Sequence, residues 1–345
     1  MHTLVGAAAF RKGIDLYFER YDGQAVTTDE LMRAIQDASG VDLTQFRLWY
    51  EQAGTPRLEV RDRFEAATRT YELTVTQRCP PTPGQPTKLP MHIPLRIGLI
   101  DAEGLDLPLR LQDETTAQST TRVLSLRKET EMFRFVDVAT RPVPSLNRDF
   151  SAPVLIDYAY SDDSLQHLLS HDSDAFNRWQ AGQRLAMTLL LQGVRDYLGG
   201  RPVRFPDYLA NAFGRVLGDA PQEPAFAAEA LALPPEVVIA ERLDQIDPEA
   251  VHVVRLTMRR FLAQRLEADL RRSYEIVATR GPYRPDAPSI GGRALRNLCL
   301  AYLMTSRATR HGRRPHKKGS GSRAAGAHQR MRSWITKANS EDRLS

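Results

Sequence analysis

Two histidines one helical turn apart are the residues of this chain whose type and spacing come nearest to catalytic chemistry. His167 and His171 would share one helix face. Two imidazoles so placed can hold zinc, and Asp172 or Asp174 could serve as a third ligand. A hydrolytic site also needs a Glu after the first His to deprotonate the zinc-bound water. Leu168 stands there instead, so the pair predicts weak zinc capture at most and fits two polar residues on a helix better.

Other catalytic signatures are absent from the sequence. The 345 residues contain no His-Glu-x-x-His motif, no glycine-rich phosphate loop and no Gly-x-Ser-x-Gly elbow. Gly281 and Gly291 lie in segments that fit turns before helices, and the pair Asp162 and Asp163 fits a helix cap better than an acid–base couple. We therefore expect no catalytic, cofactor-binding or metal-ligating residue in this chain.

The excess of positive charge lies in the C-terminal segment of the chain. Residues 305–345 hold eleven Lys and Arg against two Asp and Glu, whereas the first 304 residues hold 36 against 40. We expect this basic segment to be disordered. Its cations could bind nucleic acid nonspecifically through 307–332. Within this segment, however, no aromatic residue that could stack on a base precedes Trp334. Our hypothesis for its Arg-, Gly-, Ala- and Ser-rich composition is a shifted reading frame.

Composition favours a soluble cytoplasmic protein with no membrane contact. Hydrophobic residues make up 42% and charged residues 26% of the chain. No apolar run approaches the ~18 residues of a membrane span, and the start has no signal-peptide pattern. Two cysteines exclude a disulfide framework and fit a reducing compartment. Cys299 lies in an apolar helical run, which predicts a buried, inert thiol.

The elements that would position any site change along the chain from helices to strands and back to helices. Residues 3–53 predict three helices, the second opened by a capping box of Thr27 and Glu30. Gly54 can adopt a left-handed helix end and Pro56 cannot continue a helix, so the helical segment should end there.

A β-sandwich and a second helical region are expected next. Residues 57–159 contain short alternating runs separated by turns, which predict an antiparallel β-sandwich. Residues 161–304 return to helical spacing. Asp247 before Pro248 predicts a helix start, followed by one helix whose buried face extends from Val251 to Leu270. The fold class is therefore multidomain α+β.

Several stretches of the chain resemble the zinc aminopeptidase N family in its bacterial form. The matching stretches are 23–30, 37–43, 90–95, 142–146 and 149–154, within a similarity that runs in register from about residue 2 to 303. The resemblance implies that 1–54 is the C-terminal end of a thermolysin-like catalytic domain and 57–159 a sandwich. It also implies that 161–304 is the incomplete start of a superhelical C-terminal domain.

The resemblance also implies what this chain lacks. A complete enzyme of the family releases N-terminal residues from peptides with a zinc-activated water, using a His-Glu-x-x-His helix, a further Glu, a Gly-Ala-Met-Glu-Asn loop and a tyrosine. These elements would lie upstream of Met1, so Tyr17 and Tyr21 do not inherit the tyrosine's role. We expect a fragment that is inactive alone. The alternative is a complementing subunit whose partner is the missing N-terminal catalytic part.

Overall fold

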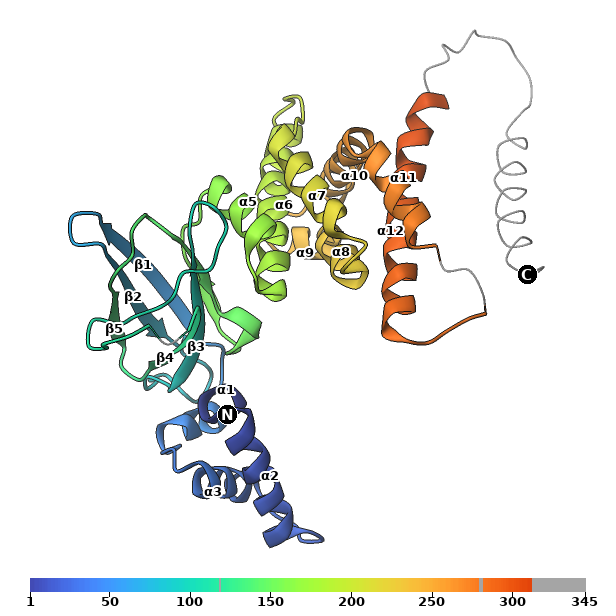
Figure 1. Cartoon of the computed structure of the whole chain (residues 1–345). Helices are drawn as coiled ribbons and strands as arrows, with labels where there is room; N and C mark the ends of the chain where they lie inside the picture. The colour runs from blue at the N-terminus through green and yellow to red at the C-terminus, as the bar shows by residue number, and fades with distance from the viewer. Residues whose placement is uncertain (118, 279–281, 312–345) are drawn as a thin grey trace, which may run out of the picture. The chain divides into compact units, whose positions relative to one another are not determined.

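The computed structural model describes residues 1–117, 119–278 and 282–311, with side chains as far as 305. The chain divides into two compact units, Met1–Leu189 and Leu190–Ser345. Figure 1 traces both units.

Short helices open the first unit. They are α1 (His2–Val5), α2 (Ala7–Tyr21), α3 (Thr28–Ser39), a 3-10 turn (Gln45–Arg47) and α4 (Leu48–Glu51). The predicted capping box is confirmed, since Thr27 Oγ1 accepts from the Asp29 N–H while a Glu30 carboxylate oxygen accepts from the Thr27 N–H. The predicted third helix is only two short turns. Gln45 donates its side-chain amide to carbonyl oxygens outside this segment, which ties the turn to the sandwich.

The sandwich has two sheets, whose strand orders are β5-β2-β1-β7 and β4-β3-β6 (Figure 1). The strands are β1 (Arg57–Glu65), β2 (Thr70–Arg78), β3 (Ile93–Ile100), β4 (Thr121–Leu126), β5 (Thr130–Phe135), β6 (Val143–Leu146) and β7 (Leu155–Asp157). Between them lies a core of aliphatic and aromatic side chains from both sheets. The alternation seen in the sequence is therefore that of strands with one face buried.

One pairing differs from the predicted antiparallel sandwich. β7 lies parallel to β1, with Leu155 opposite Arg57, and the Leu155 N–H donates to the Pro56 carbonyl at 3.0 Å. β6 and β7 belong to different sheets and are joined through a 3-10 turn, Arg148–Phe150. The chain therefore crosses between the sheets and enters the edge in the direction of β1, where a hairpin would have reversed it.

Helices follow the sandwich. α5 (Asp162–His171) and the start of α6 (Ala175–Leu198) belong to the first unit. The second unit contains α7 (Asp207–Asp219), α8 (Pro224–Ala230), α9 (Glu236–Ala240), α10 (Pro248–Arg265), α11 (Glu267–Ile276) and α12 (Ala287–His311).

The helix start at Asp247 is confirmed, but the helix beyond it is shorter than predicted. Asp247 Oδ1 accepts from the Ala250 N–H at 2.9 Å, with Pro248 in the first turn. The predicted single helix is interrupted at Leu266, whose φ of −108° and ψ of 16° are not helical. The apolar face nevertheless continues across the break, because Leu266 and Leu270 are both buried.

The C-terminal segment is described only in part. α12 runs to His311, beyond the helical boundary expected at 304. Residues 312–345, the greater part of the basic segment predicted to be disordered, lie outside the described residues. In the part of the chain that is described, no helix is both long and apolar enough to span a bilayer.

Candidate functional site

The histidine pair on α5 holds a turn of the sandwich. His167 Nε2 donates to the Asp101 carbonyl oxygen at 2.7 Å, and the two imidazole centroids are 5.0 Å apart. The His171 ring lies over Gly104, where an added Cβ would be 2.5 Å from the ring. Gly104 also has a φ of +87°, a conformation that favours glycine. The two histidines therefore contact the turn after β3, His167 by a hydrogen bond and His171 by packing on Gly104.

The two carboxylates considered as further zinc ligands are engaged elsewhere. Asp172 Oδ1 accepts from Arg148, and Asp174 Oδ1 accepts from the Asn177 N–H at the start of α6. Over the described ranges, no three His, Cys, Asp or Glu side chains are grouped so that they could hold a metal ion. These residues do not fit a resident zinc, and no local pattern in the sequence predicts that Asp172 pairs with an arginine.

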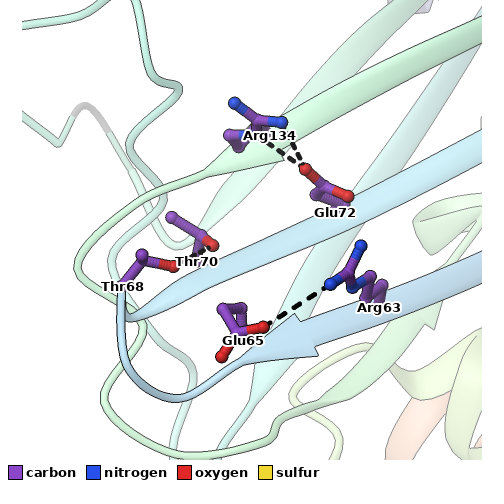
Figure 2. Close-up of a pocket in the computed structure, with 6 residues that line it drawn as sticks. All are labelled: Arg63, Glu65, Thr68, Thr70, Glu72 and Arg134. Carbon is purple, nitrogen blue, oxygen red and sulfur yellow. Dashed lines mark hydrogen bonds and ion pairs between the residues drawn. The ribbon is translucent and has the colours of Figure 1, made fainter.

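A polar hollow of about 310 Å³ lies on the outer face of the β1–β2–β5 sheet (Figure 2). Strand register sets Arg63, Glu72 and Arg134 opposite one another in one row across three strands. Glu65 and Thr70 form the next row. Local alternation does not contain the strand register that brings these side chains together.

The chemistry of the hollow is that of paired surface charges. Arg134 Nε donates to a Glu72 carboxylate oxygen at 2.8 Å, and Arg63 lies 3.6 Å from Glu65. Most of the Arg63 side chain is exposed. Such exposed pairs contribute little to stability, and the row contains no nucleophile with an adjacent base.

Both cysteines are free thiols, and Cys299 is not a reactive site. Cys299 is fully buried as predicted, and burial raises the pKa of its thiol to about 11. Cys79 is half-buried, and its thiol lies 3.6 Å from the Ala53 carbonyl oxygen near the end of the helical segment. A thiol with a raised pKa is a poor nucleophile at neutral pH.

The N-terminal helices expose an aromatic face on α2, formed by Tyr17, Phe18 and Tyr21. The Tyr17 ring lies 5.7 Å from the ring of each of the other two, and Phe18 is 57% exposed. Elsewhere along α2, Gly13 packs directly on Ile35 of α3, where an added Cβ would lie 2.8 Å from that side chain. Tyr17 and Tyr21, four and eight positions after Gly13, lie toward this packed side and are half-buried, so Phe18 is the most exposed ring of the cluster.

Two sequence-family models match the chain. Residues 54–159 match a domain of unknown function, DUF3458, with an Ig-like fold. Residues 162–329 match DUF3458_C, described as ARM repeats. The sandwich and helical organisation predicted from the sequence agree with these descriptions.

Curated relatives and a solved structure extend the similarity over most of the chain. It is 42% identical over 303 residues to aminopeptidase N of Escherichia coli and 36% identical over 303 residues to that of Haemophilus influenzae. Both matches cover 88% of this chain but 34% of the relative, in its C-terminal part. A crystal structure of Legionella pneumophila aminopeptidase A with aspartic acid has a TM-score of 0.73 and 26% identity, covering 90% of this chain and 34% of that one.

Proposed function

We propose that this chain, which belongs to the aminopeptidase N family, supplies the non-catalytic scaffold of a peptide-hydrolysing zinc enzyme and is inactive alone. The observation that carries this proposal is the extent of the match. The chain spans about a third of the length of its relatives. The sequence contains no His-Glu-x-x-His motif, the residues that would hold and activate the metal.

The cofactor and substrate belong to the complete enzyme. Zinc would be bound by the part of the relatives that this chain does not cover, and the peptides would be cleaved there. Within this chain, residues 1–54 would be the edge of the thermolysin-like catalytic domain. The sandwich and the helices after it would support and cover that domain. A cytoplasmic location is supported by two cysteines that form no disulfide.

A second candidate function is that of a complementing subunit, and the aromatic face of α2 favours it. The three aromatic rings are clustered and one of them is more than half exposed, so α2 keeps apolar surface that a partner could cover. A separate polypeptide that carries the zinc helix could bury Tyr17, Phe18 and Tyr21. Non-specific nucleic-acid binding through 307–332 is not favoured by any observation on the described residues.

Complementation tests both forms of the proposal. The chain would be co-expressed with the portion of the Escherichia coli relative outside the aligned third, and release of alanine from a fluorogenic alanyl amide would be measured. We expect turnover from the pair and none from either part. Phe18→Asp should abolish the recovery, whereas Met132→Asp, which places the same charge at a similarly exposed apolar residue of β5, should leave it intact.

Failure of the pair to associate would reject the complementing subunit and leave an inert scaffold. Association without turnover would reject it too, because a complementing subunit must restore the activity. Turnover by this chain alone would reject both forms.

A further inference from the structure

Arg148 is a buried guanidinium with partners from several elements. It is 2% exposed. Its Nε donates to Ser145 Oγ at 2.8 Å and one terminal nitrogen donates to Thr121 Oγ1 at 2.7 Å. The other terminal nitrogen donates to Asp106 Oδ1 at 2.5 Å and to Asp172 Oδ1 at 3.1 Å. The first three partners belong to the sandwich, and Asp172 follows α5.

The two carboxylates lie on opposite sides of a domain boundary. Asp106 belongs to the segment matched by the Ig-like family model, and Asp172 to the segment matched by the ARM-repeat model. The Asp172 side chain is fully buried. Burial raises the pKa of Asp172 while Arg148 lowers it, so the carboxylate depends on the guanidinium for its charged form. Both side chains are buried, so water has little access to replace either partner.

Further bonds connect the same two segments. Asp174 Oδ2 accepts from the Asp149 N–H at 2.8 Å, and Asn177 Nδ2 donates to Ser145 Oγ at 2.7 Å. Asn177 lies in the first turn of α6. The turn between α5 and α6 is therefore bonded to β6 and to the loop after it at several independent points.

The backbone around Arg148 is adapted to this position. Asn147, Asp149 and Phe150 have φ of 61°, 56° and 45°, in the left-handed region that non-glycine residues seldom occupy. Strain of this kind persists where the surrounding contacts hold it in place. Gly98 on β3 leaves the space for the guanidinium, since a Cβ there would lie 2.1 Å from Arg148 Cζ.

We propose that Arg148 locks the α5–α6 turn onto the sandwich, so that Met1–Leu189 opens as one cooperative unit across the boundary between the two family domains. The compact unit observed in the structure ends at Leu189, within α6, and not at the end of the sandwich. Arg148 is thus a positioning residue for the first helices of the helical domain. This inference does not depend on the proposed enzymatic role.

Amide hydrogen exchange of the whole chain, read by mass spectrometry, tests the lock. In the unmodified protein, the slowest-exchanging amides of α5 and of β3 should have the same protection factor. Both sets exchange only when the whole unit unfolds. Asp172→Ala removes the partner on the helix side while Arg148 keeps three partners in the sandwich. The variant should accelerate exchange in α5 about 10-fold or more and leave β3 unchanged.

Two further variants complete the test, one that removes the guanidinium and one that serves as a control. Arg148→Met should produce the same selective acceleration if the sandwich still folds, and Asp172→Ala carries the test if it does not. The control is Arg110→Ala, which removes a sandwich ion pair to the exposed Asp137 and should leave α5 unchanged. Faster exchange of α5 than β3 in the unmodified chain, unchanged α5 exchange in Asp172→Ala, or equal acceleration of α5 and β3 would each overturn the proposal.

Discussion

His92 is a buried imidazole at the junction of the N-terminal helices and the sandwich. Its Nε2 lies 2.5 Å from Ser125 Oγ, and its carbonyl oxygen accepts from the Trp49 indole at 3.0 Å. Among the described residues its Nδ1 has no hydrogen-bond partner. Burial, followed by the Arg127 charge, lowers the pKa of His92 to about 4. The facing charged groups are Arg127, Glu131, Asp42 and the N-terminal amine.

The His92 environment predicts a loss of stability in mild acid. The unfolded state binds the proton near pH 6.5 and the folded state only near pH 4, so stability falls as the pH drops through this window and levels off below it. At pH 5 the loss is about 2 kcal/mol. Urea midpoints at pH 7 and pH 5 should differ less for His92→Gln than for the parent. Equal differences would show that His92 is not responsible.

Gly98 and Arg148 are tightly packed, which predicts a second residue-level effect. A Cβ at Gly98 would lie 2.1 Å from Arg148 Cζ, so the guanidinium or the strand must move. Overpacking of this kind costs about 1–3 kcal/mol. Gly98→Ala should therefore lower the melting temperature, measured by circular dichroism. Gly218→Ala is the matched control, because an added Cβ there meets no atom within 4 Å; a larger effect at 218 than at 98 would contradict this packing.

At the scale of the elements, two local signals predict helix starts that the structure confirms. The capping box at Thr27 and the proline-preceded start at Asp247 rely on bonds within four residues, so the sequence contains all that they need. The parallel β7 and the break at Leu266 were missed. Both depend on which distant segment each residue packs against, and local periodicity does not contain that information.

Thr27 supplies an element-scale prediction. Its hydroxyl accepts from the Asp29 N–H at the start of α3, a helix that buries Met32, Ala34 and Ile35. Thr27→Ala should destabilise the first unit by about 1 kcal/mol. Thr28→Ala, at the first helical position, should be neutral, since alanine is the better helix former. Denaturant midpoints would compare the two, and equal effects would contradict a capping role.

For the candidate sites too, local sequence does not predict contacts between residues that are far apart in the chain. The spacing of His167 and His171 was visible, and so was the absence of a Glu between them. What the histidines contact was not visible, because Asp101 lies more than sixty positions away in the sequence. Arg148 was likewise overlooked. One arginine among 47 basic residues gives no local sign that it will be buried between two carboxylates.

At the scale of the whole molecule, the chain matches about a third of the length of its relatives, and our proposal places the metal chemistry in the remainder. The boundary of the compact unit within α6 also differs from the domain boundary of the family models. The sequence similarity extends across both family domains, whereas the first compact unit of the structure holds α5 and the start of α6 together with the sandwich.

Zinc content and peptidase activity of the purified chain, measured together, test the scaffold role most directly. The chain would be incubated with zinc, dialysed, analysed for bound metal and assayed with an alanyl fluorogenic amide, with and without a chelator. We expect no stoichiometric zinc and no release of the fluorophore above the uncatalysed rate. One zinc per chain, with turnover that the chelator abolishes, would contradict a scaffold that depends on another polypeptide for its chemistry.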